Sequence, residues 1–133
     1  MSRRTARKQA FLVLYQSDVN GWMVGETVKR WRSYRGDFDE YALRLSRGVD
    51  QETEYLDARL SEVSVGWPVY RMSFVDRTIL RIALYEMLFV EDVPLEVAIN
   101  EAIELATGFS SEESPAFVGG VLRGAGSRLV EHG

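Results

Sequence analysis

Hydrophobic residues recur at spacings of three and four along most of the chain, and no segment sustains the apolar-polar alternation of a β-strand. This pattern predicts an all-α fold of about six to seven helices. The helices are expected at about 3–18, at 26–34, after Asp37 or Asp39, at 74–90, at 94–108 and from Ser114 onwards. Because no linker or internal repeat separates them, we expect one domain over residues 1–133.

Residues that start or stop helices mark several of these boundaries. Asn20-Gly21 is a left-handed stop signal, Ser73 is a candidate N-cap, Gly108 is expected to end a helix, and Ser114-Pro115 supplies an N-cap and a first helical position. The helix at 74–90 is apolar on more than one face, so we expect it to be the central and most buried element. The last helix contains four glycines that each cost about 1 kcal/mol relative to alanine, so its formation depends on packing.

Composition excludes several classes of function. Cysteine is absent, which rules out disulfides, thiolate metal sites and cysteine nucleophiles. No residues have the spacing of metal ligands, of a phosphate or dinucleotide loop, or of a nucleophile beside its base, so we expect no metal, no cofactor and no catalysis. No stretch is long and apolar enough for a signal-peptide core or a membrane span, so we expect a cytosolic protein.

Charge is distributed unevenly along the chain. Residues 1–35 contain eight basic and two acidic side chains, a net charge of +6, whereas residues 36–133 contain eight basic and eighteen acidic ones, a net charge of −10. A basic segment on an acidic body attracts polyanions at one place and repels them elsewhere. The distribution therefore favours a localised nucleic-acid site.

The first predicted helix carries four cations on one face, namely Arg3, Arg4, Arg7 and Lys8. Like charges at these spacings repel, and cations near a helix N-terminus oppose its dipole, so helix stability alone does not select them. Guanidinium groups match phosphate oxygens and stack on bases, which indicates single-stranded nucleic acid as the ligand. If each cation neutralises one phosphate, log K against log salt has a slope of about −3. The alternative is a solvated basic arm.

Aromatic residues accompany the cations in two places. Phe11 and Tyr15 continue the stripe of the first helix; Phe11 is expected in the core, whereas Tyr15 fits either the core or a stacking role. The segment Lys29 to Arg35 interleaves cations with rings, as strips that bind single strands do. An amphipathic helix with Trp31 inside and arginines outside explains the same segment without a ligand, and we prefer that interpretation.

Four segments of the chain resemble the NusB family of bacterial transcription antitermination factors. They are Arg3-Arg4-Thr-Ala-Arg7-Lys8 with the following Leu14-Tyr15-Gln16, residues 75–86, residues 97–106 with Asn100-Glu101-Ala-Ile-Glu104, and residues 114–122. Their order and spacing cover essentially the whole chain. The resemblance implies two small helix bundles packed together.

The resemblance also implies a function. Members of this family bind the boxA element of nascent ribosomal transcripts together with NusE, which is also a small-subunit ribosomal protein, and the complex helps RNA polymerase read through terminators. By this resemblance Arg3, Arg4 and Arg7 match RNA-binding arginines, and Phe117 matches an aromatic residue near the RNA path. Asp76 matches an acidic residue on the NusE surface, where we also place Arg77 and Leu80. Replacing Asp76 with lysine is then expected to weaken NusE binding and to change the melting temperature little.

The chain departs from the family pattern at one point. Ala116-Phe117-Val118-Gly119-Gly120 stands where the family usually has Lys-Phe-Val-Asn-Gly, so a cation and an amide are missing near the expected RNA path. Arg30, Arg32 and Arg35 are candidates to compensate. A helical protein-interaction module without RNA binding remains the alternative function, and the resemblance is compatible with both a monomer and a homodimer. A catalytic domain, such as the one that follows a similar helical domain in some ribosomal RNA methyltransferases, has no room in 133 residues.

Overall fold

The computed structural model describes residues 2–132, with side chains described up to residue 129. Within this range the chain forms six α-helices and one short 3₁₀ helix, and no strand. The elements are α1 (Arg3–Asn20), α2 (Val24–Tyr34), α3 (Glu40–Val63), η1 (Val69–Arg71), α4 (Phe74–Phe89), α5 (Leu95–Phe109) and α6 (Ser114–His132). The predicted all-α class is confirmed.

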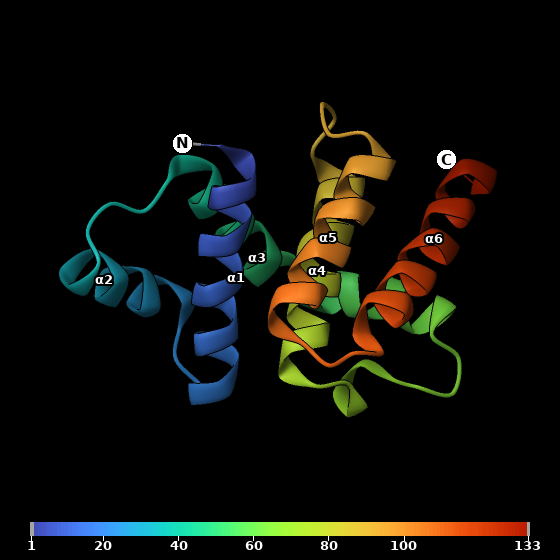
Figure 1. Ribbon diagram of the computed structural model, residues 1–133, viewed down its shortest axis with the longest axis horizontal. Coiled ribbons are helices and arrows are strands. Elements are labelled where there is room, and N and C mark those ends of the chain that lie inside the picture. The colour runs from blue at the N-terminus through green and yellow to red at the C-terminus, as the bar shows by residue number, and fades with distance from the viewer. Residues whose placement is uncertain (1, 133) are drawn as a thin grey trace.

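The helices form two groups that share α3 and α4 as their junction (Figure 1). α1 and α2 lie on one side, α5 and α6 lie on the other, and α3 runs behind both groups and contacts helices of each. The two small bundles implied by the family resemblance are therefore present. Their apolar faces merge into one continuous core that includes Phe11, Leu45, Leu56, Ile79 and Leu122.

Helix α4 is the central element, as its apolar pattern predicts. It contacts α1, α3, α5 and α6, and its buried residues face several directions. One of them is Glu86, of which only 1% is exposed to solvent. A buried carboxylate requires charged or hydrogen-bonding partners, because burial of an isolated charge costs several kcal/mol.

Capping residues explain most helix ends. The Ser2 side chain accepts a hydrogen bond from the Thr5 N–H, Asp39 accepts from Tyr41, and Ser73 accepts from Asp76, while Gly21 ends α1 with a positive φ of 69°. Asp39, rather than Asp37, is thus the cap of the third helix. No helix of the described chain is long and apolar enough to cross a bilayer.

Several helix ends differ from the sequence prediction, and one short element was not predicted. Helix α5 continues through Gly108 to Phe109, because a glycine inside a packed helix need not end it. Helix α6 begins one residue early, since the Phe117 N–H already donates to the carbonyl of Glu113. The η1 turn was not predicted, because three residues are too few to show a helical period.

One glycine is required by close packing between α3 and α4. A Cβ atom at Gly48 would overlap the ring of Tyr85 on α4. We expect Gly48→Ala to destabilise the protein by about 1–3 kcal/mol, because the ring must leave its place or the helices must separate. Thermal unfolding measures this loss, and Gly25→Ala is the control, since nothing lies within 4 Å of a Cβ built there. Equal melting temperatures for the two variants would contradict the packing argument.

Candidate nucleic-acid interface

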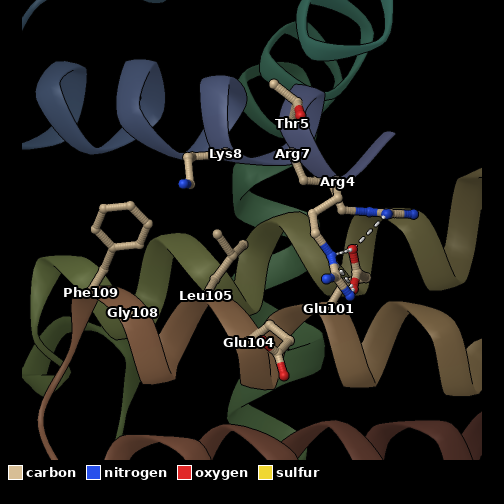
Figure 2. Close-up of a pocket in the computed structure, with 9 residues that line it drawn as sticks. All are labelled: Arg4, Thr5, Arg7, Lys8, Glu101, Glu104, Leu105, Gly108 and Phe109. Carbon is tan, nitrogen blue, oxygen red and sulfur yellow. Dashed lines mark hydrogen bonds and ion pairs between the residues drawn. The ribbon is translucent and has the colours of Figure 1, made fainter. Parts of the chain in front are cut away.

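An open cavity of about 390 Å³ lies between the first turns of α1 and the face of α5 (Figure 2). Three of the four predicted cations line it, together with two carboxylates and one aromatic ring. The lining residues are Arg4, Thr5, Arg7, Lys8, Glu101, Glu104, Leu105, Gly108 and Phe109. Within the described residues, no group of three or more acidic or histidine side chains is placed to hold a metal ion.

Arg4 is the most exposed arginine of this cavity, with 71% of its side chain open to solvent. Its Nε and Nη2 atoms donate to both carboxylate oxygens of Glu101, with a shortest distance of 2.7 Å. Its Nη1 group makes no hydrogen bond to the described residues and remains available to an external anion. The hydrogen bond from Arg4 is the main reason that the pKa of Glu101 is lowered.

Arg7 is buried, with 5% of its surface exposed, in contrast to the other three cations. Its Nε donates to the two carboxylate oxygens of Glu86 at 2.9 and 3.0 Å, and its Nη1 donates to Glu101 at 3.2 Å. The hydroxyl of Tyr41 also donates to Glu86. The pKa of Tyr41 is raised, mainly because the side chain is buried and to a lesser extent because of this hydrogen bond to Glu86. Burial opposes the charge of Arg7, yet the hydrogen bond and the charge of Glu86 raise its pKa.

Arg3 extends the same network at the surface. Its guanidinium lies 4.3 Å from the centroid of the Tyr41 ring and pairs with Asp92 at 3.1 Å. The hydrogen bond between Arg3 and Asp92 raises the pKa of Arg3 and lowers the pKa of Asp92. The carboxylates of Glu86, Asp92 and Glu101 therefore offset the repulsion among the arginines. The cations do not form a solvated arm, because α1 packs on α3 and α4, and Arg4 and Arg7 form ion pairs with Glu101 on α5.

The lowered pKa of Glu101 gives a pH prediction. A carboxyl group whose pKa is lower in the folded state contributes stability that is present above its unfolded pKa, near 4.5, and is lost as the pH falls through its folded pKa. We expect Glu101→Gln to lower stability at neutral pH by about 1–3 kcal/mol, because its bonds to two guanidinium groups weaken. We also expect a shallower fall of the melting temperature on acidification. Parallel pH profiles of variant and parent would contradict this role.

Lys8 and Phe109 form the other end of the cavity. The Lys8 Nζ lies 5.8 Å from the centroid of the Phe109 ring, which is 39% exposed (Figure 2). The Phe109 ring also packs on Phe11, which is buried as expected. Tyr15 is half-buried and also stacks on Phe11. Phe109 was not predicted as a site residue, because Gly108 is a typical helix stop and the sequence places Phe109 beyond the predicted end of the helix. The exposed ring of the cavity is thus Phe109. Tyr15 packs on Phe11, and its contact with RNA stays a prediction.

Phe117 lies apart from this cavity. It is half-buried on α6 and packs against the core, and it is not among the residues that line the space between α1 and α5. At the neighbouring Gly119, a Cβ atom would lie 3.1 Å from Cδ1 of Ile103 on α5. The glycine in place of the family's asparagine therefore fits a tight contact between α5 and α6.

Asp76 connects α4 to the α5–α6 loop. Its Oδ1 accepts a hydrogen bond from the Ser110 hydroxyl at 2.7 Å and its Oδ2 accepts one from Ser114 at 3.1 Å. Its own N–H is capped by Ser73. Asp76 is therefore a structural residue as well as a candidate partner contact. The expectation that a lysine here leaves the melting temperature nearly unchanged does not fit these contacts.

The two other residues predicted on the partner surface, Arg77 and Leu80, differ in their exposure to solvent. Arg77 is half-buried, forms a bidentate pair with Asp18 at 2.7 and 2.8 Å, and lies 4.2 Å from the ring centroid of Phe74. Leu80 is fully buried, so its predicted contact with a partner is not available at this surface. Leu80 was misplaced because α4 buries more of its circumference than a surface helix does.

The segment Lys29 to Arg35 lies away from the α1 cations. It belongs to α2, and α2 and α5 lie on opposite sides of α1 (Figure 1). Trp31 packs edge-on against Phe38, and its indole N–H donates to the carbonyl of Asp37 at 3.2 Å. The preferred interpretation as an amphipathic helix agrees with this packing, and the segment does not extend the first cavity.

A family model described as the NusB family matches residues 4–126. The transcription antitermination protein NusB of Rubrobacter xylanophilus is 67% identical over 129 residues, which are 97% of this chain and 93% of the relative.

Two solved structures have the same fold. A chain in the crystal structure of a plectonemic RNA supercoil has a TM-score of 0.90 at 27% identity, covering 98% of each chain. A chain in the crystal structure of antitermination factors NusB and NusE in complex with dsRNA has a TM-score of 0.85 at 26% identity, covering 95% of this chain and 96% of the other. The protein described here belongs to the NusB family.

Proposed function

We propose that this chain binds boxA-type single-stranded RNA of nascent ribosomal transcripts through Arg3, Arg4 and Lys8, and that it does so together with NusE. As a member of the NusB family the chain is a transcription antitermination protein and not an enzyme. A factor that acts on nascent transcripts with RNA polymerase works in the bacterial cytoplasm, and this location is part of the proposal.

One observation carries the proposal. Two exposed cations, Arg4 and Lys8, and the exposed ring of Phe109 line an open cavity between α1 and α5, and a third exposed cation, Arg3, lies next to Arg4 on α1. Residues 36–133, in contrast, carry a net charge of −10. Proteins that bind single-stranded nucleic acid combine two components. Cations contact the phosphates along the backbone, and aromatic rings stack on the bases. The Nη1 group of Arg4 and the Lys8 ammonium supply donors to phosphate, and Phe109 supplies the stacking surface.

Arg7 has a different role in this proposal. Because its guanidinium is buried between Glu86 and Glu101, it does not reach a phosphate. It fixes Glu101, and Glu101 in turn fixes the guanidinium plane of Arg4. Arg7 is thus a positioning residue, and the expected number of direct phosphate contacts falls from four to three.

The NusE surface is assigned to the N-terminal end of α4, where Asp76 and Arg77 lie. We expect Asp76→Lys to lower stability by about 1–3 kcal/mol, because two serine hydroxyls lose their acceptor, and also to weaken NusE binding. The double variant Ser110→Ala/Ser114→Ala removes the same bonds and keeps the carboxylate. It is expected to lower the melting temperature without changing NusE affinity. Unchanged NusE binding by a folded Asp76→Lys protein would remove Asp76 from the partner surface.

Titration with a boxA-type RNA, with and without NusE and at two salt concentrations, tests the function. We expect binding that weakens with salt and strengthens when NusE is present. Absence of binding to this RNA under both conditions would favour the alternative, a helical protein-interaction module.

A further inference from the structure

A second basic cavity lies between α2 and α3. It has a volume of about 380 Å³. Lys29 and Arg32 of α2 and Arg47 of α3 line it, over a floor that includes Val28 and Leu43. We call this cavity the α2–α3 groove.

The cations of the α2–α3 groove are exposed and lack carboxylate partners among the described residues. Asp50 is the one acidic residue that lines the groove, and it forms no ion pair with the three cations within 4 Å. The arginines at the N-terminal end of α1 differ, because they are paired with Glu86, Asp92 and Glu101. The groove thus has three unneutralised cations around one concave surface, on a chain with a formal net charge of −4.

Helical geometry explains why these cations converge. Lys29 and Arg32 are three residues apart on α2 and share one face, and Arg47 lies on the α3 face that carries Leu43 one turn earlier. Like charges in this arrangement repel, so folding alone gains nothing from bringing them together. An anion between the two helices would relieve this repulsion.

Rings next to the groove, on α2 and in the loop that precedes it, favour a nucleic acid over an acidic peptide as that anion. Arg30 lies 4.2 Å from the ring centroid of Trp22, and Tyr34 at the end of α2 is 86% exposed. Bases stack on exposed rings and on guanidinium planes, whereas an acidic peptide uses only the charges. A phosphate strand therefore uses more of this surface.

We propose that the α2–α3 groove binds the phosphate backbone of single-stranded RNA that flanks the boxA element. This inference rests on the proposed function, since the same transcript would occupy both sites. Figure 1 shows α2 and α5 on opposite sides of α1, so the strand would pass from the first cavity around α1 to the groove. The groove adds sequence-independent affinity, because its donors are cations and contact phosphate rather than base edges.

The test compares a short RNA that contains only boxA with the same RNA extended by a single-stranded flank on its 5′ or its 3′ side. Three additional phosphate contacts make the slope of log K against log salt steeper by about 2 for one of the extended RNAs. The variant Lys29→Gln/Arg32→Gln/Arg47→Gln is expected to lose this increment and to keep its affinity for the short RNA. Its melting temperature should match that of the parent, because the three side chains are exposed and unpaired.

The control variant Arg59→Gln/Arg71→Gln/Arg128→Gln removes the same charge at the other end of α3, in η1 and in α6, and it should retain the increment. Equal slopes for the short and both extended RNAs would overturn the inference, while binding of the short RNA would leave the proposed function intact. Failure of the short RNA to bind would instead remove the proposed function. Tighter binding of a polyglutamate peptide than of the RNA flank, lost in the groove variant, would also overturn the inference.

Discussion

Replacing Glu86 with alanine is expected to lower the melting temperature by about 10–20 °C. Glu86 is almost completely buried and is the acceptor for both Arg7 and Tyr41. Removal of one partner of a buried pair leaves an uncompensated charge, which costs about 3–5 kcal/mol. For a chain of this length each kcal/mol shifts the melting temperature by roughly 3–5 °C. Thermal unfolding followed by circular dichroism measures the loss.

A double-mutant cycle separates this charge effect from simple loss of packing. The single variant Arg7→Met leaves Glu86 without its cation and is also expected to destabilise the protein strongly. The double variant Arg7→Met/Glu86→Leu has no buried ion and should recover most of the stability, because apolar replacements of a buried pair are often neutral. Additive losses in the double variant would show that the two side chains do not interact as described.

Removing the charges of Arg4 and Lys8 is expected to weaken RNA binding about 25-fold at 0.1 M salt. Each phosphate contact of a single strand contributes a salt exponent of about 0.7, which is a factor of about 5 between 0.1 M and 1 M salt. Both side chains are exposed, so Arg4→Gln/Lys8→Gln should fold normally. Fluorescence anisotropy with a labelled boxA-type RNA measures the change.

The matched control for this variant is Arg71→Gln/Arg128→Gln, which removes two exposed charges in η1 and α6, outside the cavity on α1. It is expected to change RNA affinity little, because long-range charge effects are screened at this salt concentration. Equal losses for the two variants would mean that net charge, and not the cavity on α1, determines binding.

The fold followed from the sequence to a large extent because its helices carry strong local signals. The Asn20-Gly21 stop, the Ser73 cap and the many-sided apolar pattern of 74–90 each state a local requirement that the tertiary structure also satisfies. The predicted helix boundaries were wrong where tertiary packing, rather than local sequence, determines where a helix ends. Gly108 stays helical because α5 is packed along its length, and η1 is too short to be recognised from spacing.

The candidate site was less predictable, because the sequence of one helix does not show which of its side chains the rest of the fold will bury. The charge pattern placed Arg3, Arg4, Arg7 and Lys8 on one face, but which of them is buried depends on Glu86 and Glu101, 79 and 94 residues away from Arg7. One signal was present in the sequence. Glu86 interrupts the apolar pattern of the most buried helix, and such a carboxylate requires a cation from elsewhere in the chain.

The salt dependence of binding to a short boxA-type RNA tests the central claim most directly, namely that Arg3, Arg4 and Lys8 bind phosphate while Arg7 only positions Arg4 through Glu101. The structure predicts a slope of log K against log salt of about −2 for the parent and near 0 for Arg3→Gln/Arg4→Gln/Lys8→Gln. A slope that this triple variant leaves unchanged would contradict the account, and so would a parent slope of about −3, which requires the buried Arg7 as a fourth contact.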